Sequence, residues 1–187
     1  MVSAMNLWIR LLWLLLSAAF RPALKLPHDA SVIRTRVWPN DLDTNWHMNN
    51  GRYFTIMDLG RFDLLSRAGA WGRMSRKKWG PVLGAATIRY RQPLEVFEPF
   101  DLETRVLCWD ERWVYIEQRF IIGHGPKAGG VAAIGLVRAG FIDETRRRMV
   151  PMADAADILG ISGPSPVEPA HITEWKRAEA ALKEVTA

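Results

Sequence analysis

The pattern of apolar and polar positions divides the chain into an apolar first segment, a mixed domain and a helical tail. Residues 7–20 are strongly apolar, and Arg10 is their one charged position. At residues 31–38, β-branched residues alternate with polar ones, which predicts a first strand. From about Asn50 to Ala68, apolar residues recur at helical spacing around most of the circumference. This long helix is therefore predicted to be largely buried.

After about residue 81 the apolar period changes to two, which predicts further strands. The expected segments run from about 81, then over 101–109, 112–122 and 131–142, with Asp110-Glu111 and the glycine-rich stretch 123–130 as turns. Strands with short connections after one long helix are typical of an α+β fold with an antiparallel sheet. Such a sheet can wrap one buried helix. Within that helix, Asp63 and Arg67 are spaced to pair on an edge that remains in water.

The pattern also predicts three regions along the chain. Residues 1–26 form an apolar leader and linker, residues 27–162 a single domain, and residues 163–187 a linker and an amphipathic tail helix. A short helix is expected at 153–159. The tail helix, at 171–185, places Trp175, Ala178, Leu182 and Val185 on one side, for docking onto the domain or for binding a partner.

Three interpretations of the apolar leader compete. The uninterrupted run from Leu11 to Phe20 is about half the length that spans a bilayer, although including residues 7–9 and letting Arg10 reach the interface makes a marginal span. The alternatives are a cleavable signal with small residues at 17–19 and a helix packed on the domain. Trp8 and Trp13 suit a membrane interface. We favour a membrane-associated domain.

Basic residues after the leader predict the side of the membrane. Arg21, Lys25, Arg34 and Arg36 follow the apolar segment, which favours a domain on the cytoplasmic side. A cytoplasmic protein, or one exported after cleavage of the leader, is the alternative.

Composition narrows the classes of partner. The net charge of +5 suits an anionic partner such as an acidic membrane surface or a nucleotide-bearing molecule. No nucleic acid partner is predicted, because the basic residues are spread out and no zinc-finger or RNA-binding pattern occurs. Cys108 is the one cysteine, which excludes a disulfide framework. No metal or other cofactor is predicted, since no two histidines have ligand spacing.

The densest polar cluster lies at residues 41–51, between the first strand and the long helix. Asp43, Asn45 and His47 follow one another at every second position, so in an extended loop they point to the same side. A carboxylate, an amide and an imidazole together can orient and deprotonate a water, or the carboxylate can attack directly. The N-terminus of the helix offers unpaired N–H groups to an oxyanion. Asp41 or Asn50 is expected to cap it.

The run Pro39-Asn40-Asp41-Leu42-Asp43-Thr44-Asn45-Trp46-His47-Met48-Asn49-Asn50-Gly51-Arg52-Tyr53 resembles the signature of plant-type acyl-carrier-protein thioesterases. It is also similar to the 4-hydroxybenzoyl-CoA thioesterase group of hotdog-fold proteins. With its apolar leader, the chain further resembles the membrane-associated thioesterase superfamily member 6 group. The resemblance implies a hotdog fold, an antiparallel sheet around one central helix, and a homodimer or higher homo-oligomer with the site at the subunit interface.

The resemblance also implies roles for individual residues. Asp43, Asn45 and His47 match the catalytic set, and the backbone N–H groups of Asn49, Asn50 and Gly51 would take the thioester oxygen. The predicted substrate-binding residues are Tyr53, Arg89 and Arg91, with Lys77 and Lys78 as further candidates for CoA phosphates.

One departure from the family pattern concerns a second acid. The carrier-protein enzymes have a catalytic glutamate on the next strand, and the matching segment here, residues 88–94, has none. Gln92 or Glu95 is the candidate replacement.

The expected function is hydrolysis of an acyl-CoA or acyl-carrier-protein thioester. The first alternative is a non-catalytic hotdog protein that binds an acyl chain or lipid at a membrane, which the missing glutamate favours. The second is a hydratase or dehydratase, which the Asn-x-His-x-Asn-Asn run disfavours. Neither the acyl chain nor the choice between CoA and carrier protein follows from the sequence.

Overall fold

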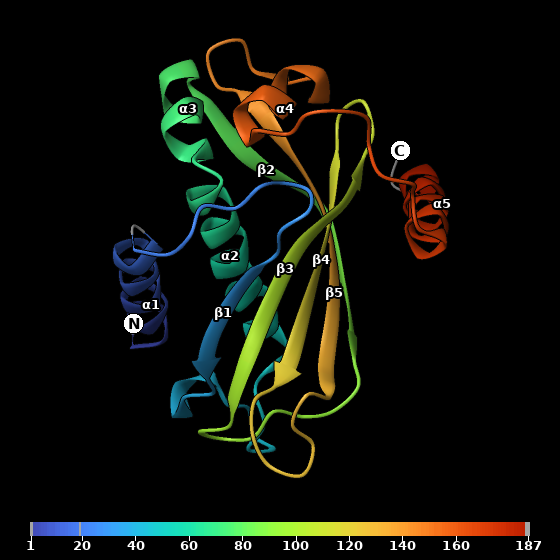
Figure 1. Ribbon diagram of the computed structural model, residues 1–187. Helices are drawn as coiled ribbons and strands as arrows, with labels where there is room; N and C mark the ends of the chain where they lie inside the picture. Colours follow the sequence, from blue (N-terminus) through green and yellow to red (C-terminus); the bar gives the residue numbers. More distant parts are fainter. Residues whose placement is uncertain (1, 19, 186–187) are drawn as a thin grey trace.

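A computed structural model describes residues 2–18 and 20–185 (Figure 1). The elements follow the order helix, strand, long helix, short helix, strands and two further helices. Their bounds are α1 (Val2–Ala18), β1 (Ser31–Arg36), the short 3-10 helix η1 (Pro39–Asp41), α2 (Asn50–Arg67), α3 (Ala70–Lys77), β2 (Trp79–Tyr90), β3 (Pro99–Trp109), β4 (Val114–Ile122), β5 (Val131–Asp143), β6 (Arg148–Met149), α4 (Met152–Leu159) and α5 (Ala170–Val185).

The strands form one antiparallel sheet in the order β1-β3-β4-β5-β2, and the two-residue β6 pairs with β5. β1 and β2 are therefore the two edges. Figure 1 shows the sheet curling around α2, and this confirms the predicted α+β architecture. The twelve-residue β2 carries an irregularity between Leu83 and Ala85, where its pairing with β5 shifts register.

α2 is the central helix, and its buried side chains form much of the core against the sheet. They are Tyr53, Ile56, Met57, Leu59, Asp63 and Leu64, with Gly60 between them. A Cβ at Gly60 would lie 2.3 Å from Thr104 Oγ1 and 2.7 Å from Gln118 Nε2. Only glycine lets the helix approach β3 and β4 this closely.

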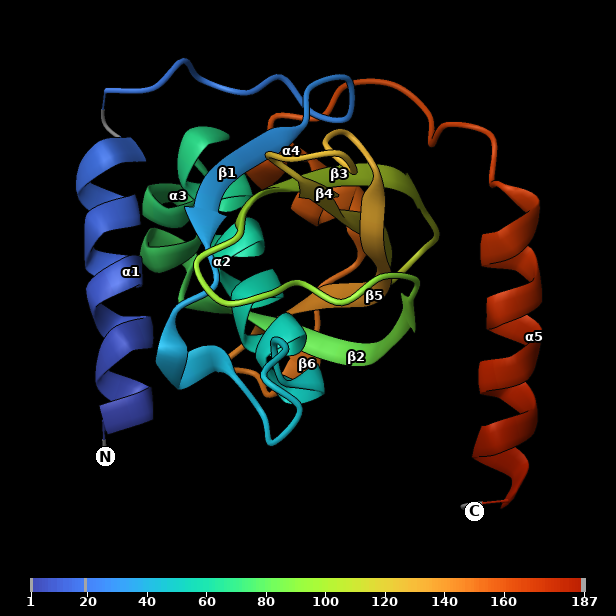
Figure 2. The same ribbon diagram turned by 90° about the horizontal axis from the view of Figure 1, so that it is seen from below.

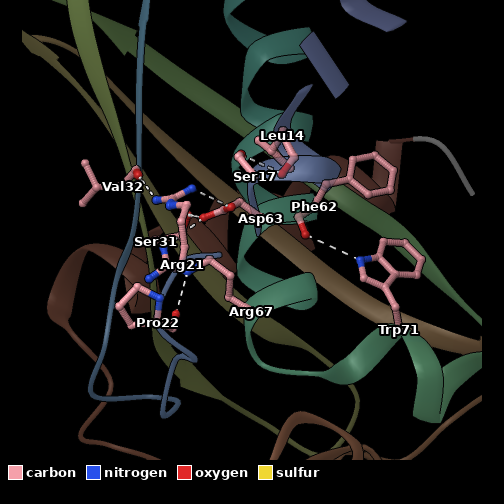
Figure 3. Close-up of polar contacts among 10 residues, drawn as sticks. All are labelled: Leu14, Ser17, Arg21, Pro22, Ser31, Val32, Phe62, Asp63, Arg67 and Trp71. Atoms are coloured by element: carbon pink, nitrogen blue, oxygen red, sulfur yellow. Dashed lines mark hydrogen bonds and ion pairs between the residues drawn. The ribbon is translucent and has the colours of Figure 1, made fainter. Parts of the chain in front are cut away.

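The Asp63–Arg67 pair forms, but not in water as predicted. Asp63 is fully buried, because Arg21 Nη1 (2.8 Å), Ser31 Oγ (2.6 Å) and Arg67 Nη1 (3.2 Å) all donate to its carboxylate (Figure 3). The spacing along the helix gave the pair correctly. The prediction that this edge of α2 remains in water was wrong, because the chain after α1 and the start of β1 cover that side of the helix.

α1 lies beside α2 and β1 (Figures 1 and 2). Leu14 is buried, while Trp8, Leu12, Trp13 and Leu16 are exposed. Within the described residues, no helix is both long and apolar enough to cross a membrane. Of the predicted cleavage site at 17–19, Ala19 lies outside the described residues.

α5 lies against the other side of the molecule, on the outer face of the sheet (Figure 2). Ile172 is fully buried beside Tyr115 and Cys108, and the ring of Trp175 meets Tyr115 edge-on. Leu182 and Val185, expected on the same docking side, are exposed. The buried apolar contacts of α5 therefore lie in its first half, while in the second half Glu179 pairs with Arg138 of β5 (3.4 Å).

Candidate active site

The polar loop between η1 and α2 is folded back on itself and is not extended. Leu42 and Met48 face each other in a β-bridge, and the N–H of Asp43 donates to the carbonyl of His47 (2.9 Å). Asp43 Oδ1 accepts the N–H of Asn45 (2.8 Å), a local turn that aspartate favours. Trp46 closes the turn at φ 60°. The loop is therefore not extended, and the every-second-residue spacing is not what places the three side chains.

The turn nevertheless brings Asp43, Asn45 and His47 to one pocket of about 340 Å³. The rest of the pocket comes from the start of α2 and the end of β2. The complete lining is Asp43, Asn45, His47, Met48, Asn50, Tyr53, Tyr90, Arg91, Gln92 and Pro93. The pocket thus contains a carboxylate, an imidazole and amides beside a helix N-terminus, as expected for an acid–base site.

The start of α2 differs in detail from the prediction. Asn49 is the cap, since its side chain accepts the N–H of Gly51 (2.8 Å), while its own N–H donates to the carbonyl of Asp41 (2.8 Å). Two of the three predicted oxyanion donors are therefore occupied. Asn50 lines the pocket, and its N–H is the one of the three that has no acceptor within residues 2–18 and 20–185. The capping residue is neither Asp41 nor Asn50.

Two tyrosines join α2 to β2 at the pocket. The hydroxyl of Tyr90 donates to the carbonyl of Asn50 (3.0 Å), and its ring meets Tyr53 edge-on at 5.1 Å. Burial raises the pKa of Tyr53 to about 12, so its phenol is neutral at physiological pH. Sequence reasoning did not assign Tyr90 to the site. The alternation of Ile88 and Tyr90 was visible, but the strand's position against α2 was not.

Of the basic residues predicted to meet CoA, only Arg91 lines the pocket. Arg89 precedes Tyr90 on β2, so its side chain leaves the opposite face of the strand. Lys77 and Lys78 lie before the start of β2. A strand of twelve residues, roughly 35–40 Å, separates them from Arg91. Within one protomer these residues do not form one phosphate site.

The missing glutamate has no carboxylate replacement in the pocket. Gln92 occupies the lining, whereas Glu95 contributes a backbone bridge to His47 and its exposed side chain is not part of the lining. Asp43 is the one carboxylate in that lining. Its Oδ2 atom contacts no donor within the described part of the chain, so it is available to a water or a substrate.

A separate apolar cavity of about 240 Å³ lies at the other end of α2. Its walls come from the C-terminal half of α2, from α3, the first half of β2, the neighbouring parts of β3, β4 and β5, and the end of α4. They include Phe62, Leu65, Trp71, Val82, Leu83 and Phe141. About 16 Å of helix lies between Asn50 and Arg61, which lines this cavity.

Comparison with known proteins gives the family. A family model described as the thioesterase-like superfamily matches residues 37–159. Protein THEM6 of Xenopus laevis is 33% identical over 178 residues, which cover 92% of this chain and 81% of that protein. Protein THEM6 of Danio rerio is 36% identical over 135 residues, covering 72% and 65%. The chain therefore belongs to the thioesterase-like superfamily.

Solved structures agree on the fold. The probable thioesterase YbaW from Escherichia coli superposes with a TM-score of 0.62 at 21% identity, covering 71% of this chain and 97% of that one. Protein SAV2348 from Staphylococcus aureus, solved in complex with CoA, has a TM-score of 0.61 at 14% identity, covering 80% and 96%. These relatives confirm the predicted hotdog fold.

Proposed function

We propose that this protein hydrolyses the thioester of an acyl-CoA or an acyl-carrier protein, with Asp43, Asn45 and His47 as its catalytic residues. The observation that carries the proposal is the pocket at the N-terminus of α2, which holds all three residues beside the N–H of Asn50. Membership of the thioesterase-like superfamily supports the same reaction. A fungal relative, thioesterase lcsJ of Purpureocillium lilacinum, is 34% identical over 51% of this chain and 37% of its own length.

The geometry suggests a role for each group. Asp43 Oδ2 accepts a proton from a water, whose oxygen then attacks the thioester carbonyl carbon. The carbonyl oxygen becomes an oxyanion that the N–H of Asn50 and the positive end of α2 stabilise. The carbon–sulfur bond breaks, and His47 delivers a proton to the departing thiolate. The proton that Asp43 took from water then passes through solvent to His47, which restores both residues. The products are a carboxylic acid and a free thiol. Direct attack by Asp43 is the alternative route, with a mixed anhydride that water then opens.

Arg91 is the one arginine or lysine in the lining of this pocket. Arg91 would meet a phosphate of CoA or of the phosphopantetheine on a carrier protein. Tyr53 and Tyr90 form an aromatic wall for the pantetheine or the acyl group. CoA is the simpler candidate, because a structural relative was solved with CoA bound.

Thiol release from a panel of acyl-CoAs, from short to long and aromatic, tests the reaction. The full chain is used in mild detergent, and a thiol reagent reports turnover. Asp43→Asn and His47→Ala should each lower kcat by about 100- to 10,000-fold. Asp154→Asn, an exposed carboxylate on α4 at the far end of the fold, is the matched control. Wild-type activity in Asp43→Asn would refute the assignment of the site.

A non-catalytic acyl-binding protein is the second candidate. The observation that favours it is the presence of Asp43 as the one carboxylate in the pocket, while the apolar cavity gives room for an acyl chain. In that case no acyl-CoA of the panel releases thiol, yet wild type and Asp43→Asn bind a fluorescent fatty acid equally well. Turnover that Asp43→Asn abolishes would exclude this function.

We also propose that two copies pair through β2. The outer side of this twelve-residue edge strand has no neighbouring strand in the described structure, and long unpaired edges are templates for pairing. Exposed Leu83 on the same strand would be covered by the second copy. Light scattering should report a dimer for wild type and a monomer for Ala85→Pro, because proline cannot donate to a strand partner. A monomeric wild type would contradict the pairing.

The outer face of α1 is proposed to rest on a membrane, with the domain on the cytoplasmic side. Exposed apolar side chains, two of them tryptophans, cover this face: Trp8, Ile9, Leu12, Trp13, Leu16. The only charge of the helix, Arg10, is turned the other way. Such a face suits the headgroup boundary. Flotation with phosphatidylcholine–phosphatidylserine vesicles should fall in Trp8→Ser/Trp13→Ser but not in Val167→Ser. Equal flotation of both variants would contradict the proposal.

A further inference from the structure

The buried residue Asp41 contacts both ends of the loop of residues 42–49, which is called the site loop below. Its backbone carbonyl accepts the N–H of Asn49 (2.8 Å), and its Oδ2 accepts the N–H of Trp38 (3.0 Å). Its Oδ1 accepts two donors of Arg52, from Nη2 (2.7 Å) and Nε (3.0 Å). Asp41 is fully buried. Asp43, Asn45 and His47 all lie between Asp41 and Asn49, so a shift of Asp41 moves the loop as a whole.

Among the residues that the structure describes, Arg10 of α1 is the one side chain from outside residues 38–52 that contacts this carboxylate. Its Nη2 pairs with Asp41 Oδ2, and it also approaches the carbonyl of Arg36 (3.4 Å). A buried carboxylate depends strongly on each of its cationic partners. Helix α1 therefore contributes its single charge to the support of the site loop.

The cost of burying Arg10 suggests a purpose beyond docking. The side chain is 10% exposed, and its Nε and Nη1 atoms have no acceptor within the described residues. Buried donors without partners destabilise a protein. A leucine or methionine would serve better in a helix that only has to pack on α2.

A second clamp holds the chain after α1 without touching the loop. Arg21 donates to the buried Asp63, together with Ser31 and Arg67, as Figure 3 shows. Asp63 lies on the fourth turn of α2, far from Asn50. Arg21 therefore fastens the leader to the domain, whereas Arg10 fastens it to the site loop.

We propose that Arg10 is a positioning residue for thioester hydrolysis: through Asp41 it holds the loop of Asp43, Asn45 and His47 in its catalytic shape. Helix α1 then supports the geometry of the active site in addition to any role in membrane attachment. The inference rests on the proposed function. It predicts that loss of the Arg10–Asp41 contact lowers turnover, because Asp41 then loses one of its two arginines.

The test compares Arg10→Met with Arg21→Met in the full chain, with Arg10→Lys as the conservative variant. Steady-state thiol release should show kcat reduced by about 10- to 100-fold in Arg10→Met, the loss expected from a displacement of the order of an ångström. KM should change little. Arg21→Met should keep its kcat within about threefold at equal or lower stability, and Arg10→Lys should recover part of the loss.

Hydrogen–deuterium exchange of residues 42–50 gives a readout that does not need activity. Exchange should speed up in Arg10→Met and stay at the wild-type level in Arg21→Met. Equal kcat values in the two variants, or equal exchange in this loop, would overturn the inference. If wild type itself releases no thiol from any substrate, the proposed function fails, and the exchange data alone decide whether Arg10 positions the loop.

Discussion

Replacing Gly60 by alanine tests whether close approach to the sheet, and not helix propensity, decides the residue at this position of α2. In a free helix the change stabilises by about 1 kcal/mol, because alanine is the better helix former. Here the new Cβ would lie 2.3 Å from Thr104 Oγ1 and 2.9 Å from Leu102 Cδ2. Neither atom can remain where it is.

The magnitude follows from what must move. Overpacking a core costs about 1–3 kcal/mol. Displacing Gln118 also endangers its hydrogen bonds to the Met57 carbonyl and Thr104 (2.9 Å each), and a buried unsatisfied group costs about 1–3 kcal/mol more. After subtracting the propensity gain, we expect Gly60→Ala to lower the free energy of unfolding by about 3 kcal/mol.

The matched control is Gly72→Ala, the same substitution in α3. A Cβ there meets nothing within 4 Å, so only propensity acts, and the variant should gain about 0.5–1 kcal/mol. Urea unfolding followed by circular dichroism measures both variants. The reasoning is refuted if Gly60→Ala is as stable as wild type, or if both variants shift in the same direction.

Three further outcomes are expected. Ile172→Ala should cost about 2–5 kcal/mol of unfolding free energy by denaturation, because Ile172 is the fully buried side chain of α5. Leu182→Ala, at an exposed position of the same helix, should change it by less than about 0.5 kcal/mol, and equal effects would contradict the docking of α5. Burial holds the folded pKa of Tyr53 at about 12, above the ordinary value of 10.0, so its contribution is present below pH 10 and is lost as the pH rises toward 12. Melting temperatures of wild type should therefore fall more steeply above pH 10 than those of Tyr53→Phe, and parallel curves would argue against it. Burial raises the pKa of the Cys108 thiol to about 11, so a thiol reagent at pH 8 should label it only after unfolding; rapid labelling of the native protein would contradict its burial.

The periodicity of the sequence predicted α2, β3, β4, β5 and α5 close to their observed bounds. Repeating apolar positions are local signals, and α2, β3, β4 and β5 each bury one face or more; in α5 the period extends over sixteen residues, although Ile172 is its one buried residue. α3 escaped prediction because Ala70 and Met74 are its only buried side chains among exposed basic residues. Two apolar positions do not establish a period.

The site was predictable as a group but not in its details. Asp43, Asn45 and His47 stand together in eleven residues of sequence, and the structure brings them to one pocket. Their roles stay predictions. Asn50 was one of three predicted oxyanion donors, but the occupation of the N–H groups of Asn49 and Gly51 was not foreseen, and neither was the presence of Tyr90, because both depend on which acceptor or strand lies beside the start of α2.

The sequence by itself therefore determined the order and type of the main elements and the position of the polar cluster. The tertiary structure decided which charges are buried. Asp63 and Asp41 become buried because Arg21 and Arg10, 42 and 31 positions earlier in the chain, reach their carboxylates. Burial and pairing of a charge depend on residues brought together only by folding, and no local pattern in the sequence records which partners will meet.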